Sequence, residues 1–199
     1  KIGLNNSLIV GDLRFDRVIE NKKQLFKNEQ IELFLNGAKA MIFGSTWPKD
    51  ERLVFTYIKQ NSHQKYIIAP HQVEEAHIVS IEQALPGITC RYSEVNPSKN
   101  VLILNTIGHL SSAYFFAKIA YIGGGFSGKL HNILEPAVFG VPVIFGPNYE
   151  RFPEATDFIN RGVGFSVESE SSFSKIIKLI EATSPEIKSK LEILISENK

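Results

Sequence analysis

Short apolar runs rich in β-branched residues alternate with longer amphipathic stretches from residue 39 onward. This alternation limits the fold most, because strand, helix and strand in succession favour a parallel sheet with helices packed on its faces. The predicted strands are AMIFGS (40–45), KYIIAP (65–70), VLILN (101–105), AYIGGG (120–125), VPVIFG (141–146) and GFSV (164–167), and TCRYSE (89–94) is a candidate further strand. We therefore expect an α/β, Rossmann-like parallel sheet with helices on both faces.

Helical spacing of apolar residues fills the segments between these strands. The predicted helices are 48–60, 73–84, 108–118, 132–139, 150–161 and 170–182. A terminal helix is expected to begin at Ser184 and Pro185, since proline is tolerated in a first turn. We expect residues 39–199 to form one nucleotide-binding domain, with residues 1–38 as an introductory segment packed on the same domain.

The composition excludes several classes of protein. The chain of 199 residues has 43% hydrophobic residues and a formal net charge of +1, so it can bury a core and has no overall charge that favours nucleic acid. Cys90 is the only cysteine, which excludes an internal disulfide and favours a reducing compartment. No apolar run is long enough to cross a bilayer, and we expect the chain, which starts at Lys1 just before a strand-like segment, to be part of a longer protein.

Ligands of open α/β sheets lie beyond the carboxyl ends of the strands, where the N-termini of the following helices favour anions. The loops that follow the predicted strands are therefore the places to look for a site. They cover residues 45–48, 70–72, 106–109, 123–132 and 146–150.

The glycine-rich loop after the fourth of these strands fits two known phosphate motifs only in part. Gly123, Gly128 and Lys129 match a phosphate loop, but Leu130 stands where that motif needs Ser or Thr to hold magnesium. The same glycines follow a late strand and lack an acidic residue about 20 positions further on, so they do not fit a dinucleotide fingerprint. The glycines instead indicate close approach by another backbone or by a ligand.

The residues after the glycines allow a structural and a functional interpretation. Asn132 is suited to cap a helix, with Glu135 three positions on to complete a capping box and Pro136 in the first turn. Alternatively, this helix start forms a wall of a nucleotide pocket, where the two oxygens of Glu135 accept hydrogen bonds from a ribose diol. The sequence leaves both open.

The stretch GGGFSGKLHNILEPAVFGVPVIFGPNYERFPEA resembles the 3-deoxy-D-manno-octulosonic acid (Kdo) transferases of lipopolysaccharide assembly. Those enzymes carry a glycine-rich strand end followed by H-N-x-L-E-P-A-x-x-G-x-P-V-x-x-G-P, which this sequence matches from His131 to Pro147. The segments GDLRFDRV, GSTWPKDE and LNTIGHLSSAYFFAKIAYIGG are also similar to the family.

The resemblance implies the C-terminal half of a GT-B glycosyltransferase that transfers Kdo from CMP-Kdo to a lipid A precursor. The absent N-terminal half would hold the acceptor and the catalytic glutamate, and the full-length enzyme would work at the cytoplasmic face of the bacterial inner membrane. No metal or other cofactor is implied, and the three histidines at strand or loop ends, His71, His109 and His131, lack the spacing of a metal site. A sugar-nucleotide epimerase of similar half-fold and a non-catalytic nucleotide-binding domain are the alternatives.

The family's contacts with CMP fall on three loops of this sequence. The predicted contacts are Pro70 and His71 in the first loop, Ile107, Gly108 and His109 in the second, and Asn132, Ile133, Leu134 and Glu135 in the third. The family often has Pro-Arg in the first loop and Met-Gly-Glu in the second. Gly124 and Gly125 are predicted to lie against the same ligand.

Four further residues receive a role before the structure is known. Arg14 stands where the family has a basic residue that steadies charge in the transition state; alternatively, it forms a surface ion pair. Ser45 and Thr46 either donate hydroxyls to the phosphate or the sugar carboxylate, or one of them caps the next helix. Lys129 is interpreted as a solvated loop residue. His63 and His77 are also expected to face solvent.

Overall fold

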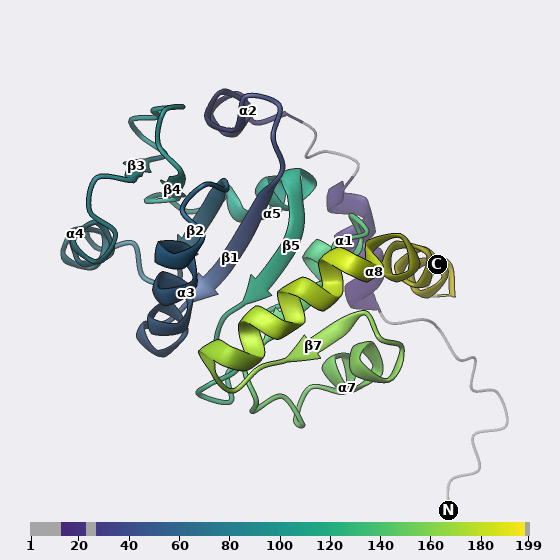
Figure 1. Cartoon of the computed structure of the whole chain (residues 1–199). Coiled ribbons are helices and arrows are strands. Elements are labelled where there is room, and N and C mark those ends of the chain that lie inside the picture. Colours follow the sequence, from purple (N-terminus) through teal and green to yellow (C-terminus); the bar gives the residue numbers. More distant parts are fainter. Residues whose placement is uncertain (1–12, 23–26, 198–199) are drawn as a thin grey trace, which may run out of the picture.

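The computed structural model describes residues 13–22 and 27–197. Its centre is a parallel sheet of seven strands, in the order β3-β4-β2-β1-β5-β6-β7 (Figure 1). The strands are β1 (Ala40–Thr46), β2 (Tyr66–Pro70), β3 (Thr89–Arg91), β4 (Val101–Ile103), β5 (Ala117–Ile122), β6 (Val143–Phe145) and β7 (Gly164–Ser166). Every paired neighbour is parallel, and the α/β, Rossmann-like class predicted from the sequence is confirmed.

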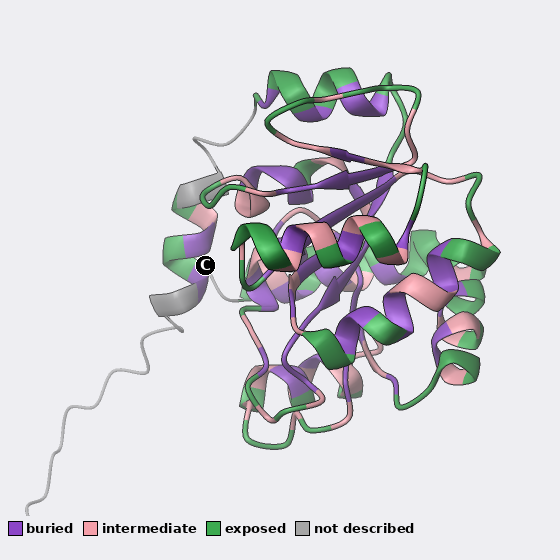
Figure 2. Ribbon diagram, turned by 90° about the vertical axis from the view of Figure 1, so that its left-hand side faces the viewer, coloured by how far each residue is buried: buried purple, intermediate pink, exposed green. Residues whose placement is uncertain are grey.

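Helices cover both faces of this sheet. They are α1 (Leu13–Lys22), α2 (Glu29–Leu35), α3 (Pro48–Gln60), α4 (Glu75–Ala84), α5 (Leu110–Ala113), the 3-10 turn η1 (Tyr114–Phe116), α6 (Leu134–Ala137), α7 (Pro153–Asn160) and α8 (Glu170–Glu197). Helices α3 and α8 pack together in front of the sheet in Figure 1, whereas α1 contacts α6 behind it. The central strands are buried on both faces, which accounts for their continuous apolar runs (Figure 2).

Several predicted elements have other bounds in the structure, and three of them are the strand at 120–125 and the helices at 108–118 and 132–139. The strand expected at 120–125 is β5, which begins at Ala117 and ends at Ile122, because Gly124 has a φ of 90° that a strand does not adopt. The helix expected at 108–118 is reduced to α5 and η1, since Gly108 has a φ of 93° and Ala117 is already extended. The helix expected at 132–139 is only the four-residue α6.

The last helix joins two predicted segments into one element with a kink. Thr183 has non-helical angles within α8, directly before Ser184 and Pro185, where a new helix was expected to start. Proline cannot donate a backbone hydrogen bond to the preceding turn, which gives the kink its cause. Ile187, Leu191 and Leu194 after the kink are buried, as the predicted apolar face requires.

Candidate functional site

The strand order reverses at the centre of the sheet. From β1 the chain passes to β2 on one side and, after β4, returns to β5 on the other side of β1. Loops that leave adjacent strands in opposite directions open a crevice at their carboxyl ends, which is where ligands of such sheets bind. The loops after β1 and β5 therefore flank the expected site.

A buried carboxylate ties these two loops together. Asp50, on the first turn of α3, is 1% exposed. Its Oδ1 accepts a hydrogen bond of 2.6 Å from the Tyr121 hydroxyl, and its Oδ2 accepts bonds of 2.9 Å from the Trp47 N–H and 3.0 Å from the Gly124 N–H. Burial, reinforced by the charge of Asp50, raises the pKa of the Tyr121 hydroxyl well above its usual range. We call Asp50 and these three donors the Asp50 junction.

The glycine-rich loop has a structural explanation in the same junction. A Cβ atom at any of three consecutive glycines would overlap the protein's own main chain, at Ser45 for Gly123, at Lys129 for Gly124 and at Gly146 for Gly125. The three glycines therefore allow other segments of main chain to approach closely. A ligand contact was predicted for Gly124 and Gly125. In the structure, main-chain atoms of the protein occupy the Cβ position of both glycines, and both residues are buried.

Ser45 and Thr46 differ in the structure, and only Thr46 has a paired, buried hydroxyl that does not fit the predicted ligand contact. Ser45 has a φ of 52° at an irregularity in the pairing of β1, a left-handed conformation that is uncommon outside glycine. Thr46 is 1% exposed and donates its hydroxyl to Glu51 at 3.1 Å, so it points into the interior in this structure. Neither hydroxyl caps α3, because Asp50 accepts from the N–H of Trp47 instead.

Glu51 also binds a histidine that was expected to face solvent. His77 Nε2 lies 2.9 Å from Glu51 Oε1, and the His77 side chain is only 16% exposed. The prediction of a solvent-facing His77 is therefore wrong: its helix, α4, turns the ring toward α3. Burial raises the pKa of Glu51, and the contact with His77 partly offsets this shift.

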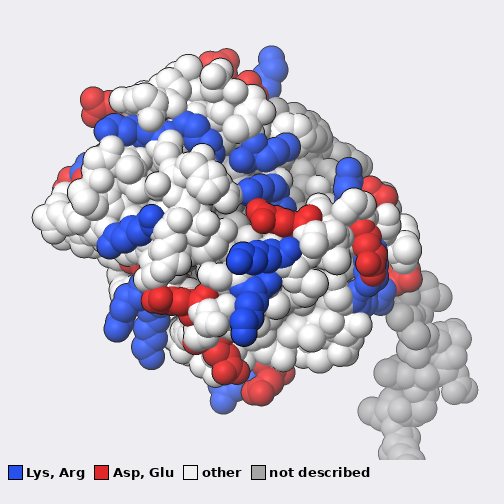
Figure 3. Space-filling model, in the orientation of Figure 1, with Lys and Arg blue, Asp and Glu red and all other residues white. Residues whose placement is uncertain are grey.

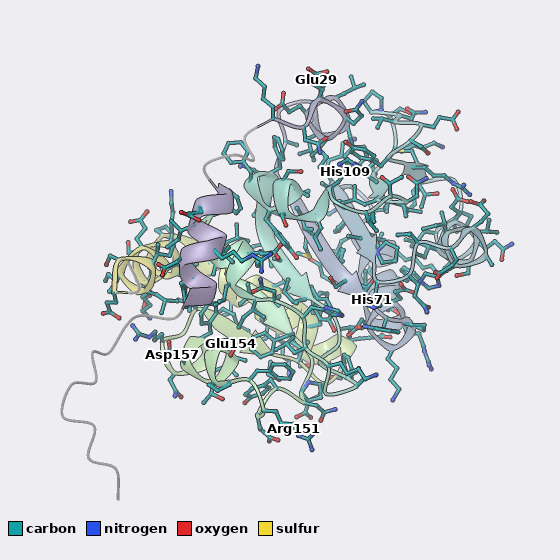
Figure 4. All side chains as sticks on the ribbon, turned by 180° about the vertical axis from the view of Figure 1, so that it is seen from behind. Glu29, His71, His109, Arg151, Glu154 and Asp157 are labelled. Carbon is teal, nitrogen blue, oxygen red and sulfur yellow. The ribbon has the colours of Figure 1, made fainter. Side chains whose placement is uncertain are left out.

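The first and third predicted loops meet through aromatic rings. The ring of His71 stacks on Trp47, with centroids 4.2 Å apart, and lies 4.7 Å from the ring of His131. Trp47 Nε1 donates a hydrogen bond of 3.2 Å to His131 Nε2. Burial, followed by the neighbouring His71, lowers the pKa of His131, while Asp50 acts in the opposite direction. Figure 4 labels His71 at the end of β2.

Helix α5, which follows the second predicted loop, meets the third loop at Glu135. Ser111, on α5, donates its hydroxyl to Glu135 Oε2 at 2.7 Å, and the amide of Asn132 donates to Oε1 at 3.2 Å. Asn132 is not the N-cap that was predicted, because α6 begins at Leu134 with Ile133 as its cap. Its side chain instead accepts a bond of 3.0 Å from the Leu134 N–H, a short turn that precedes the helix.

Glu135 lines a cavity of about 490 Å³. The other lining residues are Arg17 and Val18 from α1, Leu130, His131 and Asn132 from the loop after β5, and Phe152 and Glu154 near α7. Glu135 is half-buried, and each of its oxygens keeps acceptor capacity beyond its one protein donor. The cavity therefore combines a held carboxylate with an opening large enough for a small ligand.

A second cavity of about 320 Å³ has none of the predicted ligand contacts in its lining. It is lined by Trp47, Pro48, Lys49, Asp50, Phe126, Ser127 and Lys129. Lys129 is exposed, as predicted.

On the face of the described chain that Figure 3 shows, basic and acidic side chains are intermixed.

None of the remaining predicted residues whose side chains are described lines the cavity with Glu135, and His109 lines a separate one with Tyr92 and Thr106. Pro70 is buried at the end of β2, Ile133 and Leu134 are buried, and Gly108 is exposed. Ile107 is 84% exposed, and His109 stacks on Tyr92 at 4.1 Å (Figure 4 labels His109). Arg14 belongs to α1, but its side chain lies outside the described residues.

Several residues of the site were not predicted from the sequence. Ser111, Arg17, Phe152 and Glu154 reach it from helices α5 and α1 and from the start of α7. Ser111 lies two positions after His109 in a predicted loop, which is the one signal that would have directed attention to it. Among residues 13–22 and 27–197, no cluster of three or more His, Cys, Asp or Glu is arranged to hold a metal. None of the helices in the same ranges has the length and apolar character of a membrane span.

Similar proteins are known for most of the chain. It is 32% identical over 136 residues to a 3-deoxy-D-manno-octulosonic acid transferase of Aquifex aeolicus (strain VF5), covering 67% of this chain and 38% of that protein. It is 25% identical over 160 residues to the enzyme of the same name from Rickettsia typhi, covering 75% of this chain and 34% of that protein. The chain thus spans little more than a third of these relatives. No protein-family model matches it.

A solved structure has the same fold as this chain. The C-terminal CMP-Kdo binding domain of WaaA from Acinetobacter baumannii superposes with a TM-score of 0.71 at 23% identity, covering 90% of this chain and 98% of that domain. The predicted fold class, the C-terminal half of a GT-B glycosyltransferase, is thereby confirmed. The boundary predicted at residue 38 stays a prediction.

Proposed function

Because the chain belongs to the 3-deoxy-D-manno-octulosonic acid transferase family and has the fold of its C-terminal domain, we propose that it binds CMP-Kdo. As part of a longer enzyme, it would serve the transfer of Kdo to a lipid A precursor in lipopolysaccharide biosynthesis. The observation that carries this proposal is that Glu135 and His131 line one cavity, with Ser111 of α5 bound to Glu135 and His71, which follows β2, beside His131.

The carboxylate of Glu135 is the proposed ribose contact. Ser111 and Asn132 hold it from two directions, so its plane is set before a ligand arrives. A preset acceptor loses little conformational entropy on binding, and its free lone pairs suit two adjacent hydroxyls. The cytidine monophosphate would then lie in the cavity beside α6, with its phosphate toward His71 and His131.

Transfer would proceed by stabilising the departing nucleotide. Cleavage of the bond between the anomeric carbon and the phosphate leaves negative charge on CMP while the sugar gains oxocarbenium character. Donors fixed near that phosphate stabilise the transition state more than the ground state. Arg14 is the proposed cation, and the catalytic glutamate is proposed to belong to the N-terminal half of the enzyme, with no metal taking part. The full-length enzyme would work at the cytoplasmic face of the bacterial inner membrane.

Calorimetric titration of the chain with CMP and with UDP tests this proposal. We expect CMP to bind more tightly, because the proposed donor is a cytidine nucleotide. Preference for UDP would contradict the proposal and favour the epimerase alternative, and binding of neither nucleotide would contradict the proposal without favouring either alternative.

A substitution at the ribose contact adds a second test. Glu135→Gln removes the charge of the acceptor and is expected to weaken CMP binding roughly 10- to 100-fold, since hydrogen bonds to charged groups are the stronger ones. Glu150→Gln is the matched control, because Glu150 is exposed in a loop at the same edge of the sheet and does not line the cavity. Equal affinity for CMP in wild type and Glu135→Gln would remove the ribose contact from the proposal.

A further inference from the structure

The three rings of Trp47, His71 and His131 come from the ends of three different strands. Trp47 follows β1, His71 follows β2, and His131 lies in the loop after β5. The centroid of the His71 ring is 4.2 Å from that of Trp47 and 4.7 Å from that of His131. Such a cluster at the reversal of the strand order requires an explanation beyond core packing, because His71 is exposed.

The hydrogen bond between Trp47 and His131 fixes the state of the imidazole. An indole N–H can only donate, so the Nε2 of His131 must accept the bond of 3.2 Å. A nitrogen that accepts carries no proton, and the single proton of the neutral ring is then on Nδ1. The geometry therefore selects the neutral Nδ1–H form of His131.

The other nitrogen of this ring is unpaired within the described part of the chain and not completely buried. Nδ1 of His131 has no hydrogen-bond partner among the described residues, yet it is not one of the described polar side-chain atoms that are buried without a partner. His131 also lines the cavity that contains Glu135. Nδ1–H is thus a donor that solvent or a ligand can reach.

The charges around His131 favour the same neutral state. Burial, then the neighbouring His71, lowers the pKa of His131. Asp50 opposes this shift, but its oxygens already accept three hydrogen bonds within the Asp50 junction. Arg17, Glu135 and Glu154 are the other charged groups that line the cavity.

We propose that Trp47 is a positioning residue that holds His131 neutral, with its Nδ1–H as a hydrogen-bond donor to an anionic oxygen of the ligand. The proposal rests on the proposed function in taking that oxygen from the phosphate of CMP. A neutral donor makes this contact without taking up a proton, so its contribution stays constant through the pH range in which free histidine titrates. Loss of the indole N–H would free Nε2 and let protonation compete.

Trp47→Phe separates this role from simple packing. Phenylalanine keeps an aromatic face for His71 and removes the donor to His131 together with the smaller part of the indole ring. In the variant, we expect the imidazole of His131 to titrate at higher pH, followed by NMR of the ring protons and nitrogens. We also expect CMP affinity at pH 8 to fall roughly three- to tenfold, the size of one neutral hydrogen bond. The ratio of wild-type to variant affinity should then decrease between pH 8 and pH 6.5.

Cytidine, which lacks the phosphate, is the ligand control. Its affinity should be the same in wild type and Trp47→Phe. In a His131→Gln background, Trp47→Phe should change CMP affinity by less than twofold, because the residue through which Trp47 acts is gone. Urea unfolding of each variant checks that the fold is retained.

Several results would overturn the proposal. An unchanged titration of His131 in Trp47→Phe would mean that the indole does not set its state, and nitrogen shifts that place the proton on Nε2 would exclude the assigned tautomer. Equal losses of CMP and cytidine affinity would show that Trp47 contributes only by packing. Failure of the wild-type chain to bind CMP would overturn the proposed function and the phosphate contact together. A shifted His131 titration in the variant would then still support the assigned hydrogen bond.

Discussion

Asp50 and Glu135 are two carboxylates at the same edge of the sheet, with opposite relations to the protein around them. Asp50 is 1% exposed and accepts three hydrogen bonds, two from the main chain. Glu135 is half-buried, accepts one bond at each oxygen, both from side chains, and lines a cavity. The carboxylate of Asp50 is buried and bonded within the protein, whereas that of Glu135 is held in place and can still accept hydrogen bonds from a ligand.

This difference separates architecture from candidate site within one short sequence. The glycines of residues 123–125 and the H-N-x-L-E segment are only a few positions apart, yet the glycines pack against other main chain while the segment reaches the cavity. Phosphate motifs attract attention to the glycines. The comparison with Asp50 indicates that these glycines allow the loops after β1 and β5 to approach each other, which sets the place of His131 and Glu135.

The comparison is tested most strongly by Asp50→Ala. The substitution leaves the hydroxyl of Tyr121 and two buried N–H groups without an acceptor, so we expect the free energy of unfolding to fall by about 3 kcal/mol or more. Urea unfolding measures the loss. Glu135→Ala is the matched variant and is expected to cost less than about 1 kcal/mol, because its donors reach solvent. Similar losses in both variants would break the distinction.

The glycines offer a test of the same junction through size alone. Gly123→Ala places a Cβ against the main chain of Ser45 and is expected to destabilise the fold by about 2–3 kcal/mol. Gly128→Ala meets no atom within 4 Å and has only its φ of 69° to strain it, at about 1 kcal/mol. Thermal or urea unfolding compares the two. A larger loss at Gly128 would contradict the close approach of the two loops.

Ser111→Ala sharpens the other side of the comparison. Removal of the hydroxyl frees Glu135 to adopt other orientations, and CMP affinity should fall roughly threefold to tenfold by calorimetry. The loss should be smaller with 2′-deoxy-CMP, which lacks one of the two hydroxyls that Glu135 is proposed to accept. Ser111→Thr keeps the donor and should restore binding. Equal losses with both nucleotides would show that Ser111 does not act through the ribose contact.

The smallest effect is expected at Glu51, the buried carboxylate beside the junction. Its pKa is raised, so its protonated form stabilises the fold fully below the unfolded value of 4.5, and this stability is lost as pH rises through the higher folded pKa. Glu51→Gln has no such titration. Its stability relative to wild type should therefore increase as pH rises above 4.5, on the order of 1 kcal/mol or less because His77 offsets part of the burial cost. A difference that does not vary with pH would contradict this account.

The pattern of apolar residues predicted most of the fold, because strands such as β1 and β2 are buried on both faces and their apolar runs are unbroken. It failed where a single backbone angle decides the element, as at Gly108 and Gly124. The family resemblance predicted contacts in three loops, and these contacts stay a prediction. Local sequence could not reveal that Trp47 binds His131, 84 positions away, or that Thr46 turns inward to Glu51. These contacts depend on the tertiary arrangement of the loops.

The two outer strands of the sheet, β3 and β7, have three residues each. An open edge offers its unpaired main-chain groups to any other extended chain, and long flat edges are where sheets join and aggregate. Here both edge strands are short. On β3, the side chain of Arg91 also forms ion pairs with Glu75 and Glu82. If one end of this sheet takes the proposed ligand, the described part of the domain thus presents very little template along its flanks for unwanted strand addition.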